Sequence, residues 1–375
     1  MAGTITKKAE NTWLVRIFLG RDAEAKTKHF NKTIHGSKKD AQKFLNAKLR
    51  ERDLGRFVDP TSLSINQFLN EWLENIARSR VREATFDGYK GIVDYYINPT
   101  IGSERLCDLR PDQIQRFYGQ LQRKGLSART VRYVHSVLSS ALNHAEMQGM
   151  IFHNPCKRCQ LPKQQKTEMK YFAPDQVRQF LEAAKNSKQY ALFVLAIETG
   201  MRPGEYLALQ WKDIDFENRT LSVRRTVKVK KGGGFYYSTP KTAKSNRPLT
   251  LTPELIAALK AQRIEQLQAK MQIRDVYRDN DLVFPNEIGD PMLIGNLRKR
   301  YFETIVKDAG LPKIRLYDLR HTSATMLLSE GEHPKVVSER LGHASIVLTL
   351  DTYSHVLPNM QKQATAKMGK MMFGT

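Results

Sequence analysis

Five short motifs in the second half of the sequence contain side chains that could act on a phosphate ester. In chain order they are Thr-Gly-Met-Arg-Pro-Gly-Glu, Thr-Pro-Lys-Thr, Tyr-Asp-Leu-Arg-His-Thr, Leu-Gly-His and Asp-Thr-Tyr-Ser-His, and their reactive residues are Arg202, Lys241, Arg320, His343 and Tyr353. The sequence lacks a P-loop, a Gly-x-Gly-x-x-Gly loop, a His-Glu-x-x-His pair and a Gly-x-Ser-x-Gly elbow. It therefore gives no sign of nucleotide-driven, zinc-peptidase or serine-hydrolase chemistry.

Two arginines and a tyrosine are suited to breaking and rejoining a phosphodiester bond through a covalent protein–phosphate ester. Because the pKa of tyrosine is near 10, roughly 0.1% of Tyr353 is phenolate at pH 7, and it must attack a phosphate that is already polarised. The guanidiniums of Arg202 and Arg320 can polarise it, since each offers a planar fork to the non-bridging oxygens. His343 can hydrogen-bond the phosphate or assist proton transfer. Fixed cations then occupy the place of a metal ion, so we expect neither a metal nor another cofactor.

The composition indicates a polyanionic partner. The 375 residues include 61 Lys and Arg against 38 Asp and Glu, and residues 1–60, 61–165 and 166–375 carry net charges of +7, +5 and +11. A surplus spread over the whole chain favours nucleic acid over an ordinary solvated surface. Three cysteines are too few for a disulfide framework, and the sequence shows neither a secretory leader nor an apolar run near the ~20 residues that span a bilayer. We therefore expect a cytoplasmic protein that does not associate with a membrane.

Taken in order, the five motifs resemble the catalytic domain of the tyrosine recombinases, in particular the phage and conjugative-transposon integrases. Each motif alone has an ordinary structural interpretation, and it is their joint occurrence, ending in a tyrosine near the C-terminus, that carries the resemblance. The resemblance covers the whole chain. It implies that Tyr353 is the nucleophile, that Arg202 and Arg320 clamp the phosphate, and that Lys241, on a hairpin loop, protonates the leaving 5′-oxygen.

One position departs from the family pattern. The family commonly has His or Lys three residues before the second arginine, and this chain has Tyr317. A phenol can donate a hydrogen bond to the phosphate but is a poorer acid or base at neutral pH; Tyr317 stays a candidate site residue, and His321 could substitute for it in part. Glu205, three residues after the first arginine, is expected to orient that arginine. For the acid, Lys244 and then Arg247 are alternatives to the lysine of the second motif.

These residues need a scaffold, and the first 160 residues predict two units that precede it. Residues 1–60 alternate in polarity over 13–19 and 30–34, with a further short strand and a helix capped by Ser37, which predicts a three-stranded β-sheet plus one helix. Residues 61–160 predict an all-α four-helix bundle whose aromatic stripe is core and whose second helix stops before Pro99. The resemblance makes the first an arm-type DNA-binding domain and the second a helical core-binding (SAM-like) domain.

Residues 161–170 form a polar linker, and residues 171–375 predict a mixed, mainly α catalytic domain with a small antiparallel sheet. Within it, residues 221–229 alternate as one strand, and 235–238 return after a glycine turn. Gly200 is expected to end a buried helix and Pro203 to begin the next, which leaves the first arginine at a helix junction. The tail, residues 362–375, either packs on a neighbouring subunit or frays. The fold class is therefore multidomain α+β.

The prediction from the sequence is a site-specific DNA recombinase that integrates and excises a mobile element through a 3′-phosphotyrosine intermediate. The resemblance implies double-stranded DNA with core and arm attachment sites as partner, a homotetramer that exchanges strands through a Holliday junction, an excisionase-type directionality factor, a host DNA-bending protein and a bacterial host. Two alternatives stay open: a type IB-like topoisomerase, which relaxes supercoils without pairing two sites, and an inactive DNA-binding relative that acts as a repressor. The Cys156-Lys-Arg-Cys159 spacing resembles half of a zinc site but lacks two further ligands.

Overall fold

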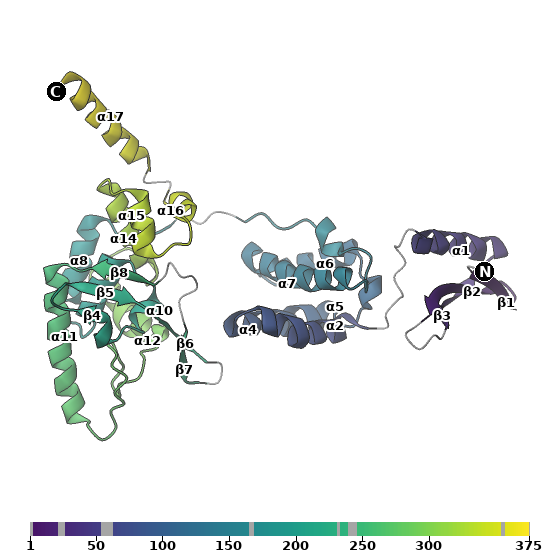
Figure 1. Cartoon of the computed structure of the whole chain (residues 1–375), viewed down its shortest axis with the longest axis horizontal. Coiled ribbons are helices and arrows are strands. Elements are labelled where there is room, and N and C mark those ends of the chain that lie inside the picture. The colour runs from purple at the N-terminus through teal and green to yellow at the C-terminus, as the bar shows by residue number, and fades with distance from the viewer. Residues whose placement is uncertain are drawn as a thin grey trace. The chain divides into compact units, whose positions relative to one another are not determined.

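The computed structural model describes residues 3–21, 27–53, 63–164, 169–230, 233–238, 246–353 and 357–374. The chain divides into two compact units, residues 1–166 and 167–375 (Figure 1). Each part has its own hydrophobic core, so each is described by itself.

The N-terminal residues form a small antiparallel sheet covered by one helix. Strands β1 (Gly3–Ala9), β2 (Thr12–Arg21) and β3 (Thr27–His35) pair in the order β1-β2-β3, and helix α1 spans Lys38–Asp53. The fully buried Val15, Ile17 and Ala41 make its centre. The Ser37 hydroxyl accepts a hydrogen bond from the Asp40 amide at 3.2 Å, which satisfies a free N–H at the start of the helix. The predicted sheet and helix are confirmed.

Four helical stretches make up the next part of the first unit. They are α2–η1–α3 (Ile65–Trp72, Leu73–Ala77, Arg78–Arg80), α4–η2–α5 (Glu83–Ile92, Val93–Ile97, Asn98–Ile101), α6 (Pro111–Arg123) and α7 (Ala128–Met147), with short 3₁₀ turns η3 (Leu106–Asp108) and η4 (Pro155–Arg158). Ser64 and Ser127 cap α2 and α7 through hydrogen bonds to their hydroxyls. The aromatic stripe is core, as predicted: Phe68, Phe117 and Tyr118 are at most 3% exposed.

The proline that was expected to end the second helix lies inside it. Pro99 is in the first turn of α5, directly after the π-helical turn η2. In that turn the Asn98 amide bonds back five residues to the Val93 carbonyl. The wider turn relieves the clash and the missing hydrogen bond that a proline causes in an α-helix, so the helix continues for two more residues. The prediction was wrong because a π-turn leaves no signature in the periodicity.

The second unit is built around a helix that is buried on nearly every side. Helix α9 (Tyr190–Thr199) packs against α8 (Pro174–Ala184), and Phe172, Phe180, Phe193 and Phe302 form an aromatic cluster between them and their neighbours. The short α10 (Pro203–Tyr206) and the 3₁₀ turn η5 (Trp211–Asp213) follow α9. This core holds the ends of α9 and α10 in place, where the first motif lies.

Two small antiparallel sheets flank these helices. Strands β4 (Ile214–Asp215), β5 (Thr220–Val223) and β8 (Arg247–Thr250) form one, in the order β4-β5-β8, and β6 (Thr226–Val229) and β7 (Phe235–Ser238) form a hairpin. The single strand predicted over 221–229 is therefore two strands in different sheets. The break falls at Arg225, whose guanidinium leaves the strand pattern to pair with the buried Asp213 at 2.6 Å.

Helices complete the second unit: α11 (Pro253–Gln272), α12–η7–α13 (Ile294–Asn296, Leu297–Phe302, Glu303–Asp308), α14 (Asp318–Ser329), α15 (Pro334–Leu341), α16 (Ile346–Thr352) and α17 (Leu357–Phe373). Helices α14, α15 and α16 enclose a small separate core of Ala324, Leu328, Val337, Leu341 and Tyr353. Among the described residues, no helix is both long and apolar enough to cross a membrane.

Candidate active site

The first arginine lies at the junction between α9 and α10. Helix α9 ends at Gly200, whose φ of 62° is left-handed, and two residues later Arg202 caps α10 in extended conformation ahead of Pro203. A Cβ at Gly200 would lie 2.6 Å from a methyl carbon of Leu341, so this close approach requires glycine. About a third of the Arg202 side chain is exposed. The backbone thus presents the guanidinium at the surface from a fixed turn.

The second arginine comes from the first turn of α14 and contacts the end of α9, at the same junction as Arg202. Arg320 is 2% exposed, and its Nη1 donates to the Gly200 carbonyl at 2.7 Å. Its Nη2 has no hydrogen-bond partner among the described residues. Burial, followed by the charge of Arg202, lowers the pKa of Arg320 to about 10, which still leaves it charged at neutral pH. A buried cation with an unused N–H is suited to bind an anion.

A single buried carboxylate lies between two of the guanidiniums. Glu205 is 4% exposed; its Oε1 accepts from Arg202 Nη1 at 2.7 Å and its Oε2 from Arg247 Nη2 at 3.2 Å. Burial raises the pKa of Glu205, but Arg247 and Arg202 outweigh it and hold the pKa below the usual value. Arg247, which is 6% exposed, also donates from Nε to the Arg340 carbonyl at 2.5 Å. Glu205 contacts Arg202, as expected from the sequence, and Arg247 is buried against the same carboxylate.

The histidine of the fourth motif follows the left-handed Gly342 at the end of α15. His343 is half-buried, and its Nδ1 lies 2.7 Å from the hydroxyl oxygen of the buried Thr349. Burial, and then the positive charges of Arg320 and Arg202, lower the pKa of His343 to about 3. At neutral pH it is therefore uncharged, and it can serve as a hydrogen-bond donor from its other nitrogen.

The tyrosine of the last motif lies at the end of α16. Tyr353 is 1% exposed, and its hydroxyl is 2.9 Å from Nδ1 of His321 on α14. Burial raises the pKa of Tyr353, although the nearby Arg320 acts in the opposite direction. Tyr317 is 40% exposed and packs edge-on against the His321 ring, with the ring centroids 5.5 Å apart. The His321 imidazole thus lies between the phenols of Tyr353 and Tyr317, near the buried Arg320.

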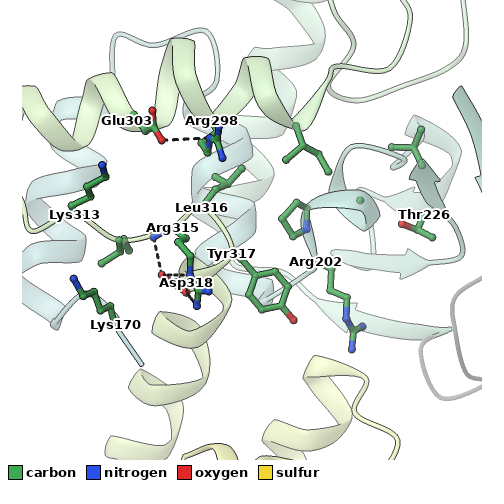
Figure 2. Close-up of a pocket in the computed structure, with 15 residues that line it drawn as sticks. Lys170, Arg202, Thr226, Arg298, Glu303, Lys313, Arg315, Leu316, Tyr317 and Asp318 are labelled. Atoms are coloured by element: carbon green, nitrogen blue, oxygen red, sulfur yellow. Dashed lines mark hydrogen bonds and ion pairs between the residues drawn. The ribbon is translucent and has the colours of Figure 1, made fainter. Parts of the chain in front are cut away.

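An open, basic cavity of about 920 Å³ lies beside these residues (Figure 2). Arg202 and Tyr317 line one part of it, and the other charged residues at its wall are Lys170, Arg298, Glu303, Lys313, Arg315 and Asp318. The two acids are paired: Asp318 with Arg315 at 2.8 Å and Glu303 with Arg298 at 3.4 Å. Since basic groups outnumber acids, the cavity favours a polyanion next to the arginines.

Five of the six site residues predicted from the sequence lie in this region: Arg202, Tyr317, Arg320, His343 and Tyr353. Lys241, the predicted acid, lies outside the described residues, as does Lys244. Within the described part of the chain, no cluster of three or more His, Cys, Asp or Glu side chains could hold a metal ion.

Sequence reasoning missed two supports of the site. Arg247 entered only as an alternative acid, and Thr349 did not enter at all. Arg247 contacts Glu205, 42 residues away, and the Arg340 carbonyl, 93 residues away. One sequence alone carries no signal for such distant pairs.

Comparison with known proteins gives matches in both units of the chain. Residues 170–360 match the phage integrase family, and residues 64–122 match the phage integrase N-terminal SAM-like domain. The chain is 32% identical over 385 residues to a protein named tyrosine recombinase XerC-like from Caldanaerobacter subterraneus, and the match covers 97% of both chains.

Two solved structures share the fold. The Tn1549 transposon integrase in complex with a circular intermediate DNA aligns with a TM-score of 0.70 at 23% identity, over 82% of this chain and 100% of that one. A lambda integrase tetramer bound to a Holliday junction aligns with a TM-score of 0.56 at 18% identity, over 91% of this chain and 95% of the other.

Proposed function

The chain belongs to the phage integrase family of tyrosine recombinases, and we propose that Tyr353, Arg202, Arg320 and His343 carry the DNA strand-transfer reaction of that family. The enzyme is a tyrosine-type site-specific DNA recombinase, an integrase that integrates and excises a mobile genetic element. The observation that carries our assignment of residues is the buried Arg320: its Nη2 has no partner in the described part of the chain, and Arg202, His343 and Tyr353 all lie within electrostatic reach of it.

In the proposed reaction the Tyr353 oxygen attacks the scissile phosphorus and displaces the 5′-oxygen. Arg202 and Arg320 bind the non-bridging oxygens and stabilise the charge that builds on them in the transition state. His343, uncharged at neutral pH, adds a neutral hydrogen bond. Lys241 is our candidate for the acid that protonates the leaving 5′-oxygen. The products are a 3′-phosphotyrosine and a free 5′-hydroxyl, and attack by a 5′-hydroxyl on the phosphotyrosine reverses the step.

We propose a division of labour along the chain. Residues 1–60 bind arm-type DNA sites, residues 61–160 bind the core site, residues 161–170 link the two units and residues 171–375 catalyse. The net charge of +7 on residues 1–60, their separate core and the SAM-like match over residues 64–122 support this division. Deleting residues 1–60 is expected to leave cleavage of an isolated core site within about threefold and to impair recombination between complete attachment sites. Equal loss in both assays would contradict the division.

The proposed assembly is a homotetramer on two DNA duplexes that exchanges strands through a Holliday junction. The shared fold with a lambda integrase tetramer bound to such a junction supports it. The exposed side chains of Met371, Met372 and Phe373 at the end of α17 supply an apolar surface suited to packing on a neighbouring subunit. An excisionase-type factor and a host DNA-bending protein would set direction, and the reaction would take place on DNA in the cytoplasm of a bacterial host.

Covalent adducts test the function directly. We would express the chain and Tyr353→Phe in bacteria, recover DNA that stays attached to protein under denaturing conditions, and sequence it. The proposal expects tyrosine-dependent adducts at a few discrete sites. Adducts scattered over the genome would indicate a topoisomerase instead. Absence of adducts while the protein still binds DNA would indicate an inactive DNA-binding relative.

A further inference from the structure

The hydroxyl of Tyr353 lies 2.9 Å from an imidazole nitrogen that the reaction above does not use. The nitrogen is Nδ1 of His321, the residue directly after Arg320 on α14. On that helix, His321 shares a face with Ala324 and Leu328, three and seven positions later. The same two residues pack with Tyr353 in the small core between α14, α15 and α16. Helix α14, which supplies the proposed phosphate-binding Arg320, therefore also holds Tyr353, through the face that carries His321, Ala324 and Leu328.

Attack by Tyr353 requires that its proton leaves. Burial makes the phenol less acidic than a tyrosine in water, so spontaneous ionisation is unfavourable. Tyr317 is a phenol and packs against the His321 ring without providing a base. His343 has its Nδ1 at hydrogen-bond distance from Thr349. His321 Nδ1 is the basic nitrogen that the structure places on the reacting oxygen.

We propose that His321 is the general base that accepts the proton of Tyr353 during cleavage and returns it during religation. This inference rests on the proposed function, since it takes Tyr353 as the nucleophile. As the tyrosine oxygen bonds to phosphorus, its proton moves to Nδ1, the imidazole carries its other proton on Nε2, and the bond from phosphorus to the 5′-oxygen breaks. The electron pair of that bond stays on the 5′-oxygen, which takes a proton from the separate acid. In religation the 5′-hydroxyl of the incoming strand loses its proton to that acid, and the imidazolium protonates the departing tyrosine oxygen.

The simplest competing role for His321 is to position the tyrosine by hydrogen bonding alone. Asparagine separates the two roles, because its Oδ1 lies close to the place of Nδ1 and accepts a hydrogen bond but is not a base at neutral pH. Alanine removes both functions. The substrate is a duplex that carries a cleavage site recovered in the adduct experiment, nicked beside that site so that the covalent complex accumulates. The measured quantity is the single-turnover rate of covalent complex formation by the full chain.

A general base is expected to contribute about 10²–10⁴ in rate. His321→Ala and His321→Asn should therefore lose similar factors in that range at pH 7, and their rates should rise about tenfold per pH unit between pH 7 and 9 as hydroxide replaces the base. Replacing Tyr353 by the more acidic 3,5-difluorotyrosine should recover at least tenfold in the His321→Ala background and change the His321-containing enzyme much less. Thermal midpoints and binding of the same duplex, compared with wild type, establish that each variant is folded.

Retention by His321→Asn of more than about a tenth of the wild-type rate would overturn the proposal, because it would show that a hydrogen bond suffices. No recovery by the fluorinated tyrosine in the His321→Ala background would overturn it as well. If His321→Ala does not fold, the asparagine variant, with and without the fluorinated tyrosine, gives the same decision. Failure of the proposed function itself looks different: the wild-type chain would then form no covalent complex with any duplex.

Discussion

Replacing Arg320 with methionine should abolish cleavage and make the protein more stable. Arg320 is 2% exposed, its Nη1 donates to the Gly200 carbonyl, and its Nη2 has no partner among the described residues. Its main electrostatic neighbour is another cation, Arg202, and the carboxylate of Glu205 acts on it more weakly. Methionine fills most of the space of the arginine stem without bringing a charge into the interior.

The size of the effect follows from the pKa of Arg320. A decrease from 12.5 to about 10 corresponds to about 3 kcal/mol against the charged form in the folded protein, at 1.36 kcal/mol per pKa unit. Losing the hydrogen bond leaves the buried Gly200 carbonyl without its donor and takes back about 1–3 kcal/mol. The free energy of unfolding should therefore rise by up to about 2 kcal/mol in Arg320→Met, which for a unit of this size corresponds to at most about 4–8 °C in the unfolding midpoint.

Fluorescence can follow the second unit alone. The chain has three tryptophans, Trp13, Trp72 and Trp211, of which the last is in the second unit. In a background with Trp13→Phe and Trp72→Phe, the Trp211 emission reports the urea-induced unfolding of that unit; urea is preferred because it leaves the ionic strength unchanged. Arg320→Lys, which keeps the buried charge, is the matched control and should show no gain. A midpoint for Arg320→Met below that of wild type, or an equal gain in the lysine variant, would refute the reasoning.

Two further predictions concern the charges around Arg320. Glu205→Gln leaves Arg202 and Arg247 without their shared counter-ion and should lower the free energy of unfolding by about 3–5 kcal/mol together with covalent complex formation. Asp213→Asn, which breaks the pair of another buried carboxylate with Arg225 elsewhere in the unit, should also lower stability but spare the reaction. Loss of the reaction in both variants would contradict the assigned role of Glu205. Because the pKa of His343 is about 3 in the folded protein, against 6.5 unfolded, the unfolded chain binds more protons between those values and stability falls as the pH drops from about 6.5 to 3. Between pH 7 and 4.5 the urea midpoint of His343→Asn should fall less than that of wild type. If the two midpoints fall by the same amount, another group is responsible for the pH dependence.

The elements that the sequence predicts well are those fixed by neighbours along the chain. Ser127 caps α7, Gly200 ends α9 in the left-handed conformation, and Pro203 begins α10, as expected from residue type. Each of these features depends on a few consecutive residues, because caps and helix ends are local hydrogen-bonding problems. Short motifs likewise point to Arg202 and Arg320, whose role in the reaction stays a prediction.

The contacts within the candidate site are long-range, and the sequence did not predict them. Arg320 reaches the carbonyl of Gly200 across 120 residues, and His321 meets Tyr353 across 32. Sequence reasoning offered His321 as a partial substitute for Tyr317 toward the phosphate, whereas the structure places it on the tyrosine oxygen. A motif states which groups are present; the packing of α14 against α15 and α16 decides which of them touch.

The arrangement of charge explains how so basic a site can fold and still leave a cation for the proposed contact with phosphate. Arg202 and Arg247 share Glu205, so one of their two positive charges is neutralised within the protein. Arg320, by contrast, is held by a backbone carbonyl, which fixes its direction without cancelling its charge. The buried charge of Arg320 lowers the stability of the free protein. A phosphate bound to Arg320 would supply the missing anion and restore that stability, so phosphate binding and folding stability are linked. Transition-state charge, which grows on the non-bridging oxygens, strengthens the same contact further. In the proposed mechanism, the instability that Arg320→Met is expected to remove is therefore the same free energy that contributes to binding of the reacting phosphate.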